Sequence, residues 1–187
     1  HECSDIAFED IVLNLTYYDN PGSTFVWTRD NPIGISSAIP MSGTAFNIGD
    51  VLAGTFTNST DAPLKVTFII TPVGPLPTNC TGNPVTSTIT VNPTPRATPD
   101  NILPAICFGT STDIILKTPT TMTKGVIDYD YFITLDASVT GNSAPDFNRP
   151  ENYHISFPYE NSSDSISSVR YHIWPKNTVS GCLIGDT

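Results

Sequence analysis

Residues 56–61 read Phe-Thr-Asn-Ser-Thr-Asp, and residues 159–164 read Tyr-Glu-Asn-Ser-Ser-Asp. In both copies a proline, Pro72 or Pro175, lies 14 residues after the asparagine. Between these two points, three apolar residues at alternate positions also recur 103 residues further on: Val66, Phe68 and Ile70, then Val169, Tyr171 and Ile173. Alternate residues of a β-strand face the same side of a sheet. The repeat therefore predicts one strand, with one buried face, in two copies of a single structural unit.

The match continues more loosely upstream. Cys3 precedes Asp10-Ile-Val-Leu13 as Cys107 precedes Asp113-Ile-Ile-Leu116, and Phe25-Val-Trp-Thr28 corresponds to Tyr131-Phe-Ile-Thr134. Short segments bounded by Gly, Pro, Asn and Ser, without helical periodicity, predict an all-β fold. The expected strands are Ile11–Thr16, Thr24–Thr28, Val51–Asn58, Leu64–Thr71 and Pro84–Val91 in the first unit, and Thr112–Leu116, Tyr129–Leu135, Tyr153–Tyr159 and Val169–Trp174 in the second. Such strands are typical of two-sheet antiparallel β-sandwiches.

Each unit has one cysteine near its start and one near its end. The four cysteines, Cys3, Cys80, Cys107 and Cys182, include no Cys-x-x-Cys pair that would suggest a zinc site. Disulfides in an oxidising, extracytoplasmic compartment are therefore the better interpretation. The repeat predicts the pairs Cys3–Cys80 and Cys107–Cys182, which are 77 and 75 residues apart.

The units are expected to form domains over residues 1–95 and 105–187, joined by a proline-rich linker over 96–104. They differ at their ends. The alternating strand Val85–Val91 follows Cys80, whereas only Leu183-Ile-Gly-Asp-Thr187 follows Cys182. A sandwich without its closing strand leaves a backbone edge and part of its core uncovered. We expect either a fragment of a longer protein or donation of the strand after Cys182 by another chain.

Few residues are charged. Lys and Arg number 8 against 18 Asp and Glu, which gives a net charge of −10 and a charged fraction of 14%, against roughly a quarter in average soluble domains. Nucleic acid is excluded as a partner because binding its phosphates requires clustered cations. No apolar run approaches the roughly 20 residues of a membrane-spanning helix, so we expect no membrane insertion.

Several segments of the first unit form a recognisable set: Asp10-Ile-Val-Leu13, Val26-Trp-Thr-Arg-Asp-Asn31 with Gly34, Leu52-Ala-Gly-Thr-Phe-Thr-Asn-Ser-Thr60, Val66-Thr-Phe-Ile-Ile-Thr-Pro72, Cys80-Thr-Gly-Asn-Pro84 and Thr88-Ile-Thr-Val-Asn-Pro-Thr-Pro95. Together they resemble the PKD-like modules of Bacteroidota, which are repeated in tandem in very large secreted surface proteins, including gliding-type adhesins. The resemblance implies two tandem immunoglobulin-like antiparallel β-sandwich domains, the second lacking its last strand. It also implies a non-catalytic extracellular building block, commonly exported by the type IX system. The second unit is less similar, and its middle, Asp136–Asn152, departs from the pattern.

Signatures of an active site are absent from the sequence. It has no Gly-x-Ser-x-Gly, no His-Glu-x-x-His and no phosphate-binding glycine loop. The spacing brings none of the three histidines, His1, His154 and His172, to a nucleophile and an acid. We therefore expect no catalytic residue and no cofactor.

Two sets of residues are candidates for binding. Asp128 and Asp130 lie two apart on an expected strand and point the same way, which makes them a weak metal candidate, although Ca²⁺ prefers about six to eight oxygen ligands. A solvated strand face is the favoured interpretation of that pair. Trp174 occupies the place of Thr71 and is expected to point outward, toward a ligand such as a surface polysaccharide or toward a neighbouring module. Trp27, in an apolar strand, is expected in the core.

Modification is a further expectation. Asn14, Asn58, Asn79 and Asn161 each begin an Asn-x-Ser/Thr sequon. Asp164-Ser165-Ile166 resembles the short Asp-Ser/Thr-aliphatic O-glycosylation site of Bacteroidota, and an expected turn exposes Ser165.

The sequence thus favours a structural or adhesive segment of a secreted or cell-surface protein, whose partners are neighbouring repeats or other copies of the protein. Three alternatives remain open. The first is a filament whose subunits are assembled by strand donation, the second an accessory module of a secreted polysaccharide-degrading enzyme, and the third a module that binds carbohydrate directly.

Overall fold

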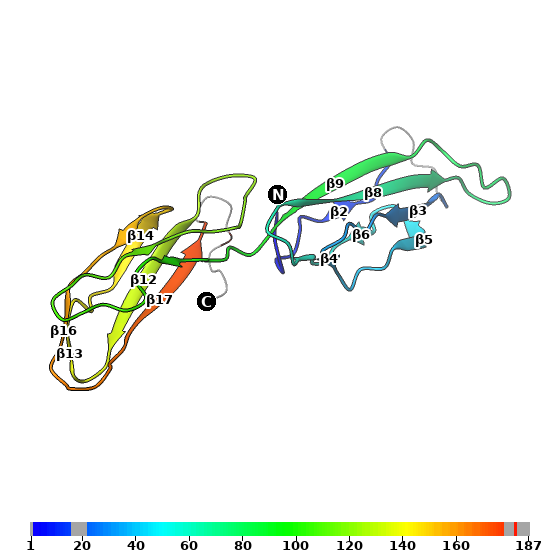
Figure 1. Cartoon of the computed structure of the whole chain (residues 1–187). Coiled ribbons are helices and arrows are strands. Elements are labelled where there is room, and N and C mark those ends of the chain that lie inside the picture. The colour runs from blue at the N-terminus through cyan, green and yellow to red at the C-terminus, as the bar shows by residue number, and fades with distance from the viewer. Residues whose placement is uncertain (1, 16–21, 178–181, 183–187) are drawn as a thin grey trace. The chain divides into compact units, whose positions relative to one another are not determined.

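The computed structural model describes residues 2–15, 22–177 and 182, and every regular element among them is a β-strand. The chain divides into two compact units, His1–Pro93 and Thr94–Thr187 (Figure 1). Each unit has a hydrophobic core of its own. The all-β, immunoglobulin-like architecture predicted from the sequence is confirmed. Within the described residues, no helix has the length and apolar character required to cross a membrane.

Unit 1 is built on a five-stranded sheet in the order β1-β9-β8-β3-β5. Two short pairs, β2-β6 and β4-β7, complete its described strands. The strands are β1 (Glu2–Cys3), β2 (Ile11–Val12), β3 (Thr24–Arg29), β4 (Ile35–Ser36), β5 (Ser42–Asn47), β6 (Val51–Leu52), β7 (Thr57–Asn58), β8 (Leu64–Val73) and β9 (Val85–Asn92). All pairs are antiparallel except β1 with β9. The long strand β8 lies between β3 and β9 and is therefore hydrogen-bonded on both edges.

Aromatic side chains surround Phe68 in the core of unit 1. The ring centroids of Phe8, Trp27 and Phe56 lie 6.1, 5.6 and 6.3 Å from that of Phe68. Trp27 is 3% exposed, which confirms its expected place in the core. Alternation along β8 buries Val66, Phe68 and Ile70, as the repeat predicts.

Unit 2 contains a three-stranded sheet in the order β14-β12-β17, a second in the order β10-β11-β15, and the pair β13-β16. Its strands are β10 (Asp100–Asn101), β11 (Ile114–Ile115), β12 (Asp128–Leu135), β13 (Val139–Gly141), β14 (Asp146–Pro150), β15 (His154–Ile155), β16 (Tyr159–Asn161) and β17 (Val169–Lys176). Strand β17 pairs with β12 over eight residue pairs. In the part of unit 2 that the structure describes, no strand follows β17.

The two units share strand register. Trp27 pairs with Ile70 in unit 1, and Tyr131 pairs with Ile173 in unit 2. The second partner of β3 is β5 and that of β12 is β14, and both partners are bulged at equivalent positions. A non-glycine residue with positive φ marks each bulge: Ala45 (59°) in β5 and Asn148 (56°) in β14. The structural equivalent of Tyr131 is thus Trp27 and not Phe25, so the upstream alignment made from the sequence was wrong by two residues. A shift of two keeps the same face inward, which is why the apolar pattern did not reveal it.

Asn58 and Asn161 form the same turn in the two units. The side-chain oxygen of Asn58 accepts hydrogen bonds from the backbone N–H and the hydroxyl of Thr60, at 3.0 and 2.8 Å. The oxygen of Asn161 accepts the same pair from Ser163, at 3.0 and 2.9 Å. Each amide nitrogen then donates to the carbonyl four residues on, in Ala62 or Ser165. The repeated Asn-Ser-Thr/Ser-Asp segment is therefore an asparagine-closed turn.

The expected linker over 96–104 is wrong in one respect, because its backbone is part of unit 2. The N–H groups of Arg96 and Thr98 donate to Thr120 Oγ1 and to the carbonyl of Lys117. Further on, β10 pairs with β11. Proline removes its own donor but leaves those of the intervening residues free to pair.

Several strands differ from the expectation. The segments Val51–Asn58 and Tyr153–Tyr159 each break into two short strands with an irregular stretch between them. Strands β5 and β14 were missed because a bulge interrupts their alternation. Of the strand expected over residues 11–16, Ile11–Val12 form β2. Its last residue lies outside the described residues, as do His1, Tyr17 and Tyr18.

Candidate functional site

The outer face of the β12-β17 pair carries a cluster of stacked rings, Phe132, His172 and Trp174. The inward residues of β12 are buried, so the intervening Phe132 points outward with Asp130 and Thr134. Phe132 pairs directly with His172, and their ring centroids are 4.2 Å apart with an interplanar angle of 8°. The ring of Trp174 stacks on Phe132 at 4.9 Å and 24°.

The structure therefore places Trp174 on the outward face, where alternation predicted it. Phe132 was not among the residues predicted for this face, although the alternation of Asp128-Tyr-Asp-Tyr-Phe-Ile-Thr134 marks it as outward. Stacking between the rings buries part of each face, while their edges and remaining faces form an apolar contact surface. His172 is the one titratable ring in the cluster, and its Nε2 lies 3.3 Å from Thr134 Oγ1. Such an arrangement suits contact with a partner more than proton transfer.

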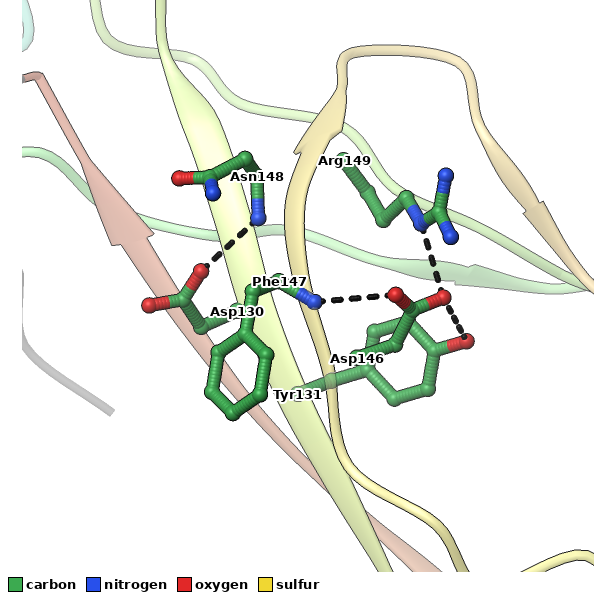
Figure 2. A network of polar contacts seen from close by, with 6 residues as sticks. All are labelled: Asp130, Tyr131, Asp146, Phe147, Asn148 and Arg149. Carbon is green, nitrogen blue, oxygen red and sulfur yellow. Dashed lines mark hydrogen bonds and ion pairs between the residues drawn. The ribbon is translucent and has the colours of Figure 1, made fainter.

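The carboxylate oxygens of Asp130, one of the two metal candidates, already have partners within the protein, one of which is drawn in Figure 2. Its Oδ1 accepts a hydrogen bond from the backbone N–H of Asn148 at 2.9 Å. Its Oδ2 forms an ion pair with Lys176 Nζ at 2.7 Å. Within the described ranges, no cluster of three or more His, Cys, Asp or Glu side chains suits a metal ion. Asp130 closes the β14 bulge and neutralises Lys176, and these roles account for its place beside Asp128 on the outward face.

A second carboxylate, Asp146, lies on the other side of the same bulge (Figure 2). Its Oδ2 accepts hydrogen bonds from Arg149 Nε at 2.7 Å and from the Tyr131 hydroxyl at 3.1 Å. Its Oδ1 accepts the backbone N–H of Phe147 at 3.0 Å. The hydrogen bond from Arg149 is the main reason why the pKa of Asp146 lies below its usual value. Burial, and then the bond to Asp146, raise the pKa of Tyr131, so its hydroxyl stays protonated and donating.

The cysteine pairing expected from the repeat is wrong in this structure. Cys3 and Cys182 are disulfide-bonded, whereas Cys80 and Cys107 are exposed free thiols. Each expected pair contains one free thiol, so neither pair forms.

Strand direction explains this result in unit 1. Cys3 lies beside Asn92, at the end of β9, while Cys80 lies in the turn before β9 begins. The strand between them spans about 23 Å at 3.3 Å per residue, far beyond the roughly 7 Å limit on the Cα separation of a disulfide.

Unit 2 repeats the arrangement. Cys107 lies with Val169 along one groove, at the start of β17, while the carbonyl of Cys182 accepts the N–H of Asn177, just beyond its end. The order of the cysteines along the chain therefore predicted which cysteines are equivalent in the two units, but not which of them are bonded.

Of the modification candidates, Asn58 is not available for N-glycosylation in the folded domain. It is 4% exposed, and its amide nitrogen donates both hydrogens, to the carbonyls of Ala62 and Val91. Asn161 is half-buried, and Ser165 is exposed in the turn beside Ile166. Modification of Asn161 and of Ser165 stays a prediction.

His154 has an acidic partner, since its Nδ1 lies 2.8 Å from Asp113 Oδ1 across the β11-β15 pair. No serine or cysteine hydrogen-bonds to His154 among the described residues, so a nucleophile for a catalytic triad is missing at this pair. The third histidine, His172, belongs to the aromatic cluster.

Two β-sandwich units that share register, bulge and turn define a tandem immunoglobulin-like repeat protein. The sequence model of the PKD-like domain matches residues 2–95, and the chain belongs to this family. No curated protein matches the chain. Among solved structures, a YadV chaperone shares 13% identity, with 89% of this chain and 86% of that chain covered and a TM-score of 0.26.

Proposed function

We propose that this chain is a non-catalytic structural and adhesive segment of a large, repeat-containing secreted or cell-surface protein, of the gliding-adhesin type found in Bacteroidota. The observation that supports it is the PKD-like match over residues 2–95 together with the recurrence of the same register and turn in unit 2. PKD-like domains are commonly extracellular and typically non-catalytic. Export by the type IX system belongs to the same proposal.

The physical basis of a spacer role is that each unit has a separate core. Modules of this kind can be joined in series, because each one folds around its own contacts and its neighbours need not contribute to its core. The long, fully paired strand β8 gives unit 1 a continuous hydrogen-bonded centre. A surface with few charges stays hydrated through Thr, Ser and Asn without attracting polyions.

Two experiments test this proposal. Antibodies raised against residues 1–187 should label intact cells of the source organism or its culture medium, and labelling that requires permeabilisation would contradict a surface role. Pulling single chains between marker domains in reducing buffer, so that no disulfide limits the extension, should give two unfolding events, each releasing about 90 residues, or about 30 nm at 3.3–3.6 Å per residue. A single event that releases the whole chain would contradict independent modules.

The adhesive part of the proposal is assigned to the aromatic cluster of Phe132, His172 and Trp174. A surface polysaccharide is the partner to test first, since a sugar can pack its apolar face on an exposed ring. A glycan array probed with the wild-type chain and with Trp174→Ala should show signals that the variant loses. Phe147→Ala is the matched control, because Phe147 is an exposed ring on the neighbouring strand β14. Signals that survive in Trp174→Ala would remove this residue from the adhesive face.

Assembly by strand donation is a second candidate function, favoured by the edge of β17 with which none of the described strands pairs. An accessory role in a polysaccharide-degrading enzyme would require a catalytic domain in the native polypeptide, which mass measurement and sequencing of that polypeptide would reveal.

A further inference from the structure

One groove in unit 2 has a volume of about 660 Å³ and borders β17. Its walls include Val139, Tyr159, Val169 and Tyr171. In unit 1 the equivalent space is filled. Val66, the repeat counterpart of Val169, pairs with Ile89 of β9 and is fully buried. The groove therefore coincides with the position of β9 in the other copy of the fold.

The burial of the repeated apolar residues also indicates that β17 lacks the cover that β9 gives to β8. In unit 1 the inward residues of β8, Val66, Phe68 and Ile70, are at most 5% exposed. Their counterparts on β17, Val169, Tyr171 and Ile173, are only half-buried. The sequence is equally apolar at these positions, so the difference reflects the cover that β9 provides.

Two further groups in unit 2 lack what β9 supplies in unit 1. The second amide hydrogen of Asn58 bonds to the carbonyl of Val91 on β9, whereas Asn161 Nδ2 donates only to Ser165 within the described residues. In unit 1, Cys3 lies in β1 because β9 is its partner. Its counterpart Cys107 lies outside any strand, and Phe108 beside it is 69% exposed.

We propose that unit 2 binds one β-strand with the uncharged, alternating chemistry of β9, in the antiparallel register that β9 adopts on β8. One strand would satisfy all these groups. It pairs with the free edge of β17, places aliphatic side chains in the groove, offers a carbonyl to Asn161 and gives residues 106–107 a partner. The chemistry follows from β9 itself, Val85-Thr-Ser-Thr-Ile-Thr-Val-Asn92, which is uncharged and has buried Ile89 and Val91 at alternate positions. This inference rests on the proposed function and deepens it by naming the kind of strand that completes unit 2.

The first test adds a fluorescent peptide of residues 83–93 to the intact chain. Saturable binding is expected, together with slower hydrogen exchange in β17 and unchanged exchange in β8. The matched control peptide carries Ile89→Asp and Val91→Asp, which would bury charge in the groove, and it should lose binding. No binding of the first peptide, or equal binding of both, overturns the proposal.

The free thiol of Cys107 allows a second test, of register. Cys3 lies opposite Asn92 in unit 1, so a peptide with Asn92→Cys, supplied as a mixed disulfide with a small aromatic thiol, should place its sulfur beside Cys107. The Cys107 thiolate then attacks that sulfur, forms the protein–peptide disulfide and releases the aromatic thiolate. A peptide with Val85→Cys carries its thiol at the other end of the strand and should not cross-link to Cys107. Equal cross-linking of both peptides, or reaction of the first peptide at Cys80 alone, overturns the proposed register.

The proposal of a surface spacer and the proposal that unit 2 binds a strand can fail separately. Without peptide binding, a surface location and independent unfolding of the units would still support a spacer. Peptide binding by a protein found only inside the cell would leave strand acceptance intact and remove the surface role.

Discussion

Gly43 illustrates how closely the core of unit 1 is packed at one position. A Cβ at this residue would lie 2.5 Å from Trp27 Nε1 and 2.6 Å from Phe46 Cε2. Trp27 is 3% exposed and cannot move without displacing other core rings. Only a residue without a side chain fits between the two rings.

Gly43→Ala should therefore destabilise unit 1 by about 1–3 kcal/mol, the usual cost of overpacking. The measurement is urea unfolding followed by Trp27 fluorescence in a Trp174→Phe background, which removes the other tryptophan. Ser42→Ala, on the exposed neighbour in β5, is the control and should change the free energy of unfolding by less than about 0.5 kcal/mol. Equal stability of the two variants would show that the rings can give way.

Asp146 predicts a pH dependence of the stability of unit 2. Its pKa is lowered in the folded state, chiefly by the hydrogen bond from Arg149. The unfolded chain therefore binds a proton more readily, so the stabilisation is complete above the ordinary carboxyl pKa of about 3.9 and is lost as pH falls through the folded value. Asp146→Asn should destabilise unit 2 at pH 7, and its difference from wild type should shrink below about pH 4.

Hydrogen exchange of β12 in urea, measured at several pH values, reports this difference. Asp164→Asn is the charge-matched control, since Asp164 is exposed and lies in the turn after Asn161. A gap between Asp146→Asn and wild type that stays constant down to pH 2.5 would contradict the role of the carboxylate.

Individual side chains were predicted from the sequence where alternation alone decides their direction. Trp27 inward and Trp174 outward follow from the period of two. The burial of Asn58 could not be predicted this way, because it depends on an acceptor in β9, 33 residues away. The same applies to Asp130, whose partners Asn148 and Lys176 come from two other strands.

Strands β8 and β17 have the same apolar pattern and different surroundings. β8 has partners on both edges, and β17 is paired with β12 alone among the described strands. An unpaired edge leaves every second backbone N–H without a partner in the sheet.

Alternate amides of β17 should therefore exchange faster than those of β12, by about tenfold or more, because β12 is paired on both sides and belongs to the same unit. NMR-detected hydrogen exchange at single residues measures this. The comparison within unit 2 removes any difference in stability between the units. Uniform protection along β17 would mean that its free edge is already covered.

Long strands were predictable, and short or bulged ones were not. β3, β8, β9, β12 and β17 match the expected segments within two residues, since each shows an uninterrupted alternation. The bulges at Ala45 and Asn148 reverse the phase of β5 and β14, so that apolar residues no longer mark one face. Pairing across the sheet, which sequence periodicity does not record, decides where such strands form.

Across both units, the repeat predicted which cysteines are equivalent but not which are bonded. Each free thiol is the counterpart of a bonded cysteine: Cys107 of Cys3, and Cys80 of Cys182. Cys3 and Cys182 are 6% and 5% exposed, whereas Cys80 and Cys107 are exposed. The two bonded cysteines are therefore the buried ones, and the two free thiols are the exposed ones.

The native chain, purified without reductant, should accordingly contain two thiols that react with a small aromatic disulfide reagent, and four after reduction in denaturant. Reactivity requires a thiol that the reagent can reach, and the side chains of Cys80 and Cys107 are both exposed. Cys80→Ser should lower the native count to one, and Cys80→Ser with Cys107→Ser should lower it to zero, while Cys3→Ser should not reduce it. A native count of zero in the wild-type chain would contradict this assignment, and peptide mapping would then show whether Cys80 had paired with Cys3 after all.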